Sequence, residues 1–347
     1  MRILITGNLG YVGPVLVRHL RSVWPGAELL GFDSGFFAHC LTGAATAPET
    51  RLDAQYYGDL RQFPPALLSG VDAVVNLAAI SNDPMGNQFE ALTLDINHRA
   101  GLSLAEAARK AGVRSFVFAS SCSVYGFAAD GARSETSAVD PLTAYARSKV
   151  FLERDLALLA GPEFQVTCLR FATACGWSER LRLDLVLNDF VASAIASRRI
   201  TILSDGTPWH PLIHVNDMAR AIEWAVTPGR PGGESLVVNA GSDGWNYQVR
   251  DLAAAVAAAF PGVEVSLNAD APPDRRSYRV DFARFRALAP GHQPRVGLAE
   301  AVGGLKAGLE SMGFCDPDFR QSPLIRLRTL RGHLESGRLD EHLHWRP

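Results

Sequence analysis

The chain has few cysteines and almost no net charge, and each scarcity excludes a class of protein. Its five cysteines, among 347 residues, are scattered and include no C-x-x-C pair. Neither a disulfide framework nor a cysteine-based zinc site is therefore indicated, and we expect no metal. The 34 basic and 36 acidic residues give a net charge of −2, which offers no electrostatic footprint for nucleic acid or for an anionic membrane.

The sequence also lacks long apolar runs and a secretion signal. Its longest helix-like apolar stretch, residues 252–260, is about half of the ~20 residues needed to cross a bilayer. The first residues lead directly into an apolar strand pattern, without the charged and apolar regions of a signal peptide. We therefore expect a cytoplasmic protein. Hydrophobic residues make up 47% of the chain, which is enough apolar material for a sizeable core.

Short apolar runs alternate with longer helical patterns through the first half of the chain. Nearly continuous apolar runs, typical of parallel strands buried on both faces, predict strands at 2–6, 28–32, 73–77, 115–119 and 165–170. Helical spacing predicts helices at 12–23, 88–111 and 142–159, with a shorter one near 65–69. This alternation predicts an α/β fold with a doubly wound parallel sheet and right-handed crossovers.

The pattern loosens after residue 176, which indicates a second, smaller α/β lobe. The expected helices and strands alternate there at 185–197, 200–203, 215–226, 236–239, 247–260 and 264–267. We expect one domain over residues 1–176 and a mainly substrate-binding lobe over 177–347, with some segments returning to the first sheet. The tail from Ser322 has helical spacing, and Gly337 is expected to end its main helix.

A glycine-rich loop follows the first predicted strand and opens the first helix. Its glycines allow a tight turn and a close backbone approach, and the helix N-terminus offers free N–H groups to a pyrophosphate. The loop residues expected at a dinucleotide are Gly7, Asn8, Leu9, Gly10, Tyr11, Val12 and Gly13. Asp33 ends the second strand, where a carboxylate accepts hydrogen bonds from the adenosine ribose and repels a 2′-phosphate. NAD is therefore favoured over NADP, although Arg51 and Arg61 could serve a 2′-phosphate.

Further cofactor candidates lie at the ends of neighbouring strands, because ligands bind outside the carboxyl ends of such sheets. Asp59 and Leu60 follow an aromatic pair and are expected beside the adenine. Small residues end the third strand, which would let the backbone pass close to a flat cofactor. The candidates at the third and fifth strands are Leu77, Ala78, Ala79 and Phe171.

Tyr145 and Lys149 are the candidate catalytic pair. Helical spacing puts the phenol and the ammonium on one face of the 142–159 helix. A tyrosine has a pKa near ~10 and is a poor base at neutral pH unless a nearby positive charge stabilises the phenolate. Lys149 could supply that charge. Ser121 lies just past the fourth strand, where its hydroxyl could bridge the substrate oxygen and the phenol, so the three residues predict chemistry on a substrate hydroxyl.

With these motifs the chain resembles the extended short-chain dehydrogenase/reductase family, and within it the NAD-dependent nucleotide-sugar epimerases and dehydratases typified by UDP-glucose 4-epimerase. The resemblance covers most of the chain. It rests on the glycine loop, Asp33, residues 76–79, Ser121 with Tyr125-Gly126, Tyr145, Lys149, and residues 205–206 and 213–217.

The resemblance implies a Rossmann lobe, a small C-terminal sugar-nucleotide lobe, and a homodimer packed through the helices around 88–111 and 142–159. It also implies a role for each member of the catalytic triad. Ser121 would orient the substrate hydroxyl, Tyr145 would exchange its proton, and Lys149 would hold the cofactor ribose and lower the pKa of the tyrosine.

The sequence departs from this family on the expected substrate side. Family 4,6-dehydratases carry an acidic pair directly after the catalytic hydroxyl residue, because eliminating water needs a general acid and a base. Cys122 and Ser123 stand there instead, which disfavours dehydration. Thr173 replaces an asparagine of many relatives, and His210 replaces an arginine that grips the diphosphate. We expect all four side chains at the substrate.

Other cations must then compensate for the missing arginine. Arg182, Arg275 and Arg276 are the candidates for the substrate diphosphate, and Arg276 lies in a segment that resembles the family's late phosphate-binding segment. Ser81 and Asn82, just after the third strand, could select the sugar or could cap the helix that follows.

The favoured function is an NAD-dependent nucleotide-sugar epimerase that acts at C4 by transient oxidation to a keto-sugar and return of the hydride. A nucleotide-sugar ketoreductase or dehydrogenase of the same family is the alternative, and a 4,6-dehydratase or a non-catalytic dinucleotide-binding protein is less favoured. His214 and Asp217 are interpreted as structural rather than as an acid/base pair.

Overall fold

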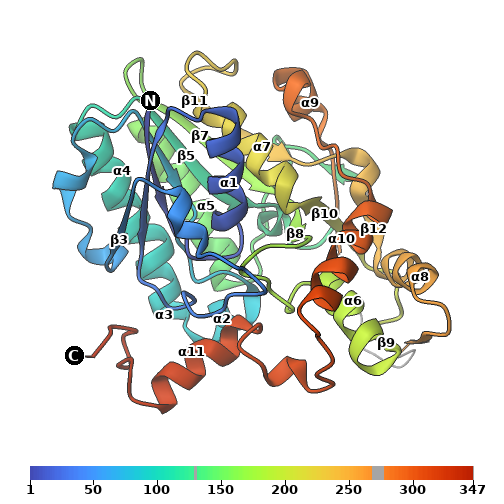
Figure 1. The fold of residues 1–347 in the computed structure, drawn as a ribbon. Helices are drawn as coiled ribbons and strands as arrows, with labels where there is room; N and C mark the ends of the chain where they lie inside the picture. The colour runs from blue at the N-terminus through green and yellow to red at the C-terminus, as the bar shows by residue number, and fades with distance from the viewer. Residues whose placement is uncertain (129–130, 268–276, 347) are drawn as a thin grey trace.

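The computed structural model describes residues 1–128, 131–267 and 277–346 (Figure 1). Its central sheet has seven parallel strands in the order β11-β7-β5-β4-β1-β2-β3. Their bounds are β1 Arg2–Thr6, β2 Glu28–Asp33, β3 Ala54–Tyr57, β4 Ala73–Asn76, β5 Ser115–Ser121, β7 Gln165–Phe171 and β11 Ser235–Ala240. The predicted doubly wound α/β sheet is confirmed. The strand order reverses between β1 and β4, and such a switch point opens a ligand crevice at the carboxyl ends of the strands.

Helices cover both faces of this sheet, which explains its continuous apolar strands. The helices α1 (Gly13–Val23) and α7 (Val215–Val226) lie on one face, and α4 (Gly101–Lys110) and α5 (Ala144–Leu159) lie on the other. In β1, Ile3 and Ile5 are fully buried toward the first pair and Leu4 toward the second. Successive strand residues point to opposite faces, so every position of β1 between Arg2 and Thr6 must be apolar.

The remaining elements build smaller sheets around three helices. A three-stranded sheet has the order β12-β10-β8, and β9 pairs with β13. The bounds are β8 Thr173–Cys175, α6 Val186–Ser197, β9 Arg199–Ile202, β10 Trp209–His214, β12 Asn246–Gln248, α8 Val249–Ala259, β13 Glu264–Leu267 and α10 Leu298–Ser311. Helix α6 packs against both α8 and α10. The short elements β6 (Ala132–Arg133) and β14 (Arg279–Val280) pair with each other, and α9 (Ala283–Leu288) packs against β11.

Several boundaries differ from the sequence-based expectations. The single helix predicted at 88–111 is divided. Its first residue, Gln88, ends α2 (Asp83–Gln88), and the rest forms α3 (Glu90–Thr93), the π-helix η4 (Leu94–Ala100) and α4. Phe89 has φ −121° and ψ 49°, which is not helical, so the chain turns between α2 and α3. The short helix expected near 65–69 is a 3₁₀ turn, η3 (Pro65–Leu68).

Several elements have no counterpart among the sequence-based predictions, and β3 and α10 are two of them. Strand β3 is four residues long and lies at the sheet edge, so it lacks a buried apolar run. Helix α10 contains three glycines, which weaken its helical pattern. One of them, Gly308, is required by packing, because a Cβ there would lie 2.2 Å from the Trp177 ring.

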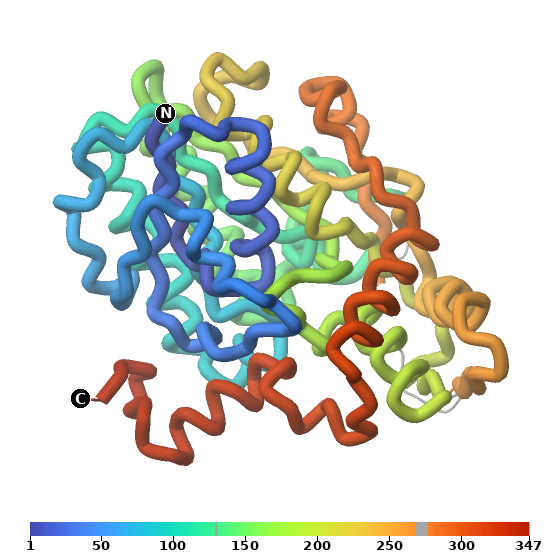
Figure 2. The backbone as a smooth tube through the Cα atoms, in the orientation of Figure 1, coloured from blue at the N-terminus to red at the C-terminus, as the bar shows by residue number. Residues whose placement is uncertain are grey.

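The C-terminal tail runs back along the N-terminal half of the molecule (Figure 2). Its helix α11 spans Arg326–Glu335, and Gly337 follows with φ +71°. Arg331 in α11 donates to the side chain of Gln88 in α2, at 2.9 Å from Nε to Oε1. Within the part of the chain that the structure describes, no helix is both long and apolar enough to cross a membrane.

Candidate active site

A cavity of about 1130 Å³ lies at the carboxyl ends of the central strands. Most residues predicted from the sequence line it together, although they come from strands, loops and helices far apart in the chain. These are Gly7, Gly10, Tyr11, Val12, Asp33, Asp59, Leu60, Leu77, Ala78, Ala79, Ser81, Asn82, Ser121, Ser123, Tyr145, Lys149, Phe171, Thr173, Arg182 and His210.

The glycine loop is shaped by two positions that no larger residue can occupy. Gly7 has φ +75°, and a Cβ there would lie 2.4 Å from the backbone nitrogen of Ala78. A Cβ on Gly13 would lie 1.9 Å from the carbonyl oxygen of Asn8. Asn8, Leu9 and Gly13, which were also expected at the cofactor, do not line the cavity and lie on the side of the loop that faces away from it. The loop therefore presents backbone rather than side chains, as a dinucleotide site requires.

Asp33 holds the loop in place and faces the cavity. Its carboxylate accepts the backbone N–H groups of Leu9 (3.0 Å) and Gly35 (2.7 Å). Burial raises the pKa of Asp33, and these two hydrogen bonds oppose the rise. The carboxylate therefore lies at the end of β2, where the sequence analysis expects it to receive an adenosine ribose.

Asp59 is held by a neighbouring cation. The guanidinium of Arg61 donates to both of its carboxylate oxygens, at 3.0 Å from Nε. Burial of Asp59 opposes ionisation, but the bonds from Arg61 outweigh it and lower the pKa of Asp59. Arg61 is thus engaged by a carboxylate, which weakens the case for this arginine as a 2′-phosphate ligand.

Ser121, Tyr145 and Lys149 converge on the cavity from β5 and α5. Thr143 caps α5 by accepting the N–H of Ala146 (3.1 Å), which fixes the start of the helix and the direction of its first turns. Lys149 Nζ lies 5.3 Å from the centroid of the Tyr145 ring, and Ser121 lines the same cavity as Tyr145. The i and i+4 spacing therefore gives the predicted shared face.

The electrostatics of this pair are set mainly by burial. Burial raises the pKa of Tyr145 to about 12, with a further increase from Asp83, while the hydrogen bond from Ser121 and the charge of Arg182 lower it. Burial lowers the pKa of Lys149 to about 7, and Glu153 opposes that change. Lys149 Nζ donates to the carbonyl of Ala119 at 2.7 Å. The phenol thus needs additional positive charge before it can act as a base.

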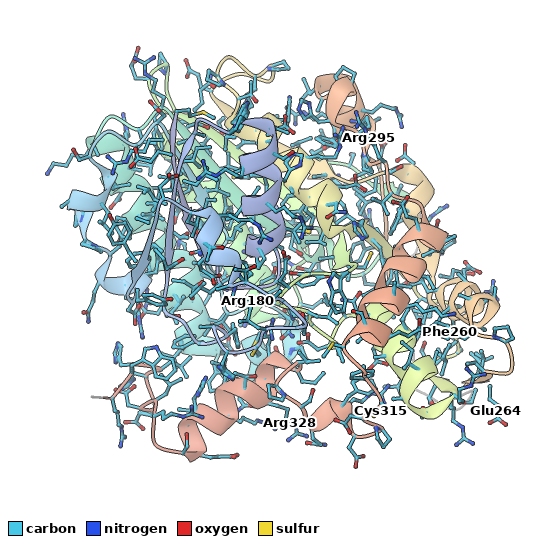
Figure 3. The ribbon with its side chains drawn as sticks, viewed as in Figure 1. Arg180, Phe260, Glu264, Arg295, Cys315 and Arg328 are labelled. Atoms are coloured by element: carbon cyan, nitrogen blue, oxygen red, sulfur yellow. The ribbon has the colours of Figure 1, made fainter. Side chains whose placement is uncertain are left out.

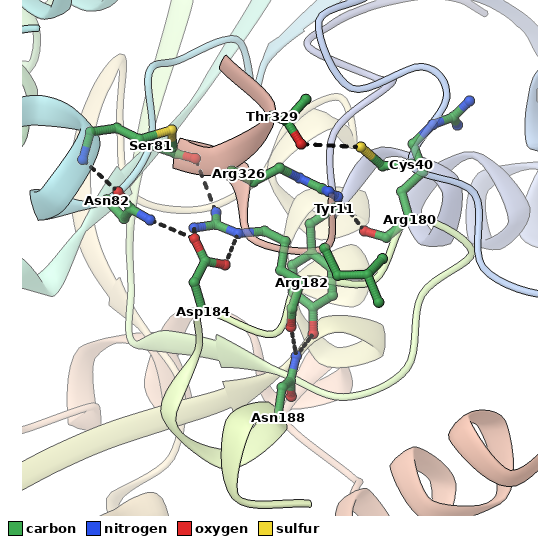
Figure 4. A network of polar contacts seen from close by, with 12 residues as sticks. Tyr11, Cys40, Ser81, Asn82, Arg180, Arg182, Asp184, Asn188, Arg326 and Thr329 are labelled. Atoms are coloured by element: carbon green, nitrogen blue, oxygen red, sulfur yellow. Dashed lines mark hydrogen bonds and ion pairs between the residues drawn. The ribbon is translucent and has the colours of Figure 1, made fainter. Parts of the chain in front are cut away.

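A polar network crosses the expected substrate side of the cavity (Figure 4). Arg182 donates to Ser81 Oγ (3.0 Å) and to Asp184 (2.9 Å), and Asn82 Nδ2 donates to Asp184 (2.7 Å). Asn82 has φ +104°, a strained value for a residue other than glycine, and its side chain caps α2. The network joins the loop after β4 to the segment before α6. Asp184 was missed by the sequence analysis, because a lone acid in a loop carries no pattern.

The other predicted substrate residues divide into two groups. Ser123, Thr173 and His210 line the cavity. Cys122 does not reach it: the 3₁₀ turn after β5 directs this side chain into the protein, where it is fully buried and Sγ donates to the carbonyl of Arg170 (3.2 Å). Burial also raises the pKa of the Cys122 thiol. Arg275 and Arg276 lie outside the described residues.

His214 and Asp217 occupy structural positions, as interpreted from the sequence. His214 Nδ1 accepts the N–H of Asn216 (3.2 Å) and caps α7, and burial lowers the pKa of His214 to about 4. The Asp217 carboxylate accepts the backbone N–H groups of Arg295 and Val296. Neither side chain lines the cavity.

The sheet, the glycine loop, the acid at the end of β2 and the Ser–Tyr–Lys group together define an NAD-binding enzyme of the short-chain dehydrogenase/reductase type. A family model described as the NAD dependent epimerase/dehydratase family matches residues 3–241, and the chain belongs to this family.

Individual relatives agree with this assignment. The chain is 30% identical to a UDP-glucose 4-epimerase of Mycolicibacterium smegmatis, over 87% of this chain and 96% of that protein. It is 27% identical to a dTDP-glucose 4,6-dehydratase of Streptomyces griseus, over 86% and 91% of the two chains. The solved structure of MoeE5 with UDP-glucuronic acid and NAD has a TM-score of 0.76 and 27% identity, covering 89% of this chain and 99% of that one. The extended-family resemblance and the NAD cofactor are confirmed.

Proposed function

We propose that the enzyme is a nucleotide-sugar epimerase that acts at C4. The observation that carries this proposal is the convergence of Ser121, Tyr145 and Lys149 on one cavity, while neither residue after Ser121 is acidic. The triad provides for oxidation and reduction at a hydroxyl-bearing carbon. Elimination of water would need a further acid and base, and Cys122 and Ser123 provide neither by the usual route.

The residues on the cavity wall fit NAD. The glycine loop has no room for a Cβ at Gly7, Asp33 presents a carboxylate for a ribose diol, and Lys149 presents an ammonium beside Tyr145. Bound NAD supplies a hydride acceptor that can later return the hydride, together with a positive charge near the phenol.

In the proposed reaction Tyr145 takes the proton of the C4 hydroxyl and later returns it. Ser121 holds that hydroxyl, since its own hydroxyl lies on the same cavity and acts on Tyr145 by lowering the pKa of the phenol. Lys149 stabilises the phenolate electrostatically, and a keto-sugar forms at C4. The keto-sugar turns within the cavity, so that the carbon is reduced on its other face. Because no net oxidation occurs, the cofactor stays bound through turnover.

The test starts from protein purified without added cofactor. It should carry NAD and should interconvert C4 epimers among UDP-, dTDP-, GDP- and CDP-hexoses, seen as changed sugar configuration by NMR at unchanged mass. Tyr145→Phe should lose about 10²–10⁴-fold in rate and keep its NAD. Loss of one water in the product would instead establish a dehydratase, the activity named for the Streptomyces griseus relative. Stoichiometric consumption of NADH or NADPH would establish a ketoreductase.

We also propose that two copies pair through the π-helix η4, α4 and α5. Leu158 on α5 is 79% exposed, and the proposed pairing would cover it. Light scattering should give a dimer for the wild type and a monomer for Leu158→Glu. A dimer that survives this substitution would contradict the proposed interface. The expected cytoplasmic location stays a prediction.

A further inference from the structure

The C-terminal tail packs against the loop that leaves β2 toward the cavity. Trp345 Nε1 donates to the carbonyl of Ser34 (2.6 Å), and His333 Nε2 lies 2.9 Å from the carbonyl oxygen of Phe36. Ser34 and Phe36 follow Asp33 and line the cavity. The tail is therefore part of the wall on the side where the NAD-binding residues lie.

Arg326, the first residue of α11, places a guanidinium in this wall (Figure 4). Its side chain is fully buried, at 1% exposure, and its charged group lies 5.0 Å from the centroid of the Phe37 ring. It donates to two oxygens, the carbonyls of Arg180 (2.7 Å) and Pro323 (3.4 Å). No carboxylate of the described residues pairs with it.

Other buried guanidiniums are compensated differently. Arg170, Arg180 and Arg182 each form an ion pair with a carboxylate. Arg230 has no such pair in the described ranges, but it donates to four oxygens and does not line the cavity. A guanidinium has five N–H donors, so Arg326 is the least compensated of these cations.

A buried cation is costly unless an anion balances it. Burial lowers the pKa of Arg326 to about 10, and the nearby charges of Arg182 and Arg180 lower it further, while Asp184 opposes them. The group still carries its charge at neutral pH. At Arg326 the cavity wall thus holds a guanidinium that no carboxylate of the described residues pairs with, and its planar donor fork suits a diphosphate.

We propose that Arg326 binds the diphosphate of NAD, so that the C-terminal tail supplies part of the cofactor site. A nucleotide sugar also carries a diphosphate. The diphosphate of the cofactor is favoured over that of the substrate for two reasons. Arg326 stacks on Phe37, which lies in the loop that follows Asp33. The tail also hydrogen-bonds to that same loop at Ser34 and Phe36.

The experiment compares Arg326→Met and Arg326→Lys with Arg328→Met. Arg328 is the matched control, because it is exposed two residues further along α11 (Figure 3). NAD-loaded enzyme is mixed with radiolabelled NAD, and the rate of exchange is measured, with the UDP dissociation constant measured in parallel. Arg326→Met should exchange NAD about 10- to 100-fold faster, Arg326→Lys less so, and Arg328→Met at the wild-type rate. UDP affinity should change less than twofold.

A second measurement separates cofactor binding from folding. Added NAD raises the melting temperature of a protein that binds it. If Arg326 contacts the cofactor, the increase in melting temperature on adding NAD should be smaller in Arg326→Met than in the wild type. If Arg326 is purely structural, the substitution should lower the melting temperature equally with and without NAD, and this result would overturn the proposal. Wild-type exchange in Arg326→Met would also overturn it. A fall in UDP affinity in Arg326→Met with an unchanged rate of NAD exchange would also overturn the proposal, because it would show that Arg326 binds the substrate instead.

Discussion

Glu153 lies one turn beyond Lys149 on α5, and replacing it with glutamine should impair both stability and catalysis. The Glu153 carboxylate is 5% exposed and pairs with Arg170, at 2.7 Å from Oε2 to Nη2. It also accepts the hydroxyl of Ser120. Its negative charge raises the pKa of Lys149, which burial lowers to about 7. Glu153→Gln removes this charge at nearly constant volume.

The expected loss of stability follows from the ion pair. Removing one partner of a buried pair leaves the other charge unbalanced and costs about 3–5 kcal/mol. For a chain of 347 residues that corresponds to a fall in melting temperature of roughly 4–7 °C.

Glu153→Gln should also change how the catalytic rate depends on pH. Without Glu153 the pKa of Lys149 falls from about 7 to a lower value, so the ammonium that stabilises the Tyr145 phenolate is lost at lower pH. The alkaline limb of the kcat profile should therefore move to lower pH, and each unit of that shift is a tenfold rate loss on the limb. Rates measured from pH 5.5 to 9.5, with melting curves, test this. Glu163→Gln, at an exposed loop position, is the control. An unshifted profile in Glu153→Gln would refute the reasoning.

Two further predictions concern the loop and the lysine. Gly7→Ala should destabilise the fold by about 2–4 kcal/mol in a urea titration and lower the NAD content of the purified protein, because the added Cβ would clash with the backbone of Ala78 at a position of positive φ. Gly26→Ala is the control: a Cβ there would have no atom within 4 Å, so this variant should unfold like the wild type. Lys149 binds its proton less tightly in the folded than in the unfolded chain, so stability should rise from pH 7 toward pH 10, by up to about 1.4 kcal/mol per unit. Lys149→Met should abolish that slope in urea unfolding, and an unchanged slope would contradict the assignment.

Features encoded locally were predicted from the sequence. The strands of the central sheet other than the edge strand β3 can be recognised as apolar runs because both faces of the sheet are covered, and the glycine loop can be recognised as a pattern next to β1. The spacing of four residues between Tyr145 and Lys149 predicts that both lie on one face of their helix. Each of these signals lies within about one helix or one turn of chain.

Features that depend on distant contacts were not predicted. Cys122 was expected at the substrate because it follows Ser121, but the turn after β5 points it into the core. Arg326 had no signal beyond helical spacing, since its place on the cavity wall depends on docking of the tail against residues nearly 300 positions earlier. The π-helix η4 likewise interrupts a pattern that reads as one helix.

Deuterium at C4 of a nucleotide sugar that the enzyme interconverts gives the most direct test of the mechanism. If Tyr145 moves only the hydroxyl proton and the hydride returns to the carbon it left, the epimer should keep its deuterium at C4, with no loss of mass and no added cofactor. Appearance of solvent hydrogen at C4, or a product lighter by one water, would contradict the account.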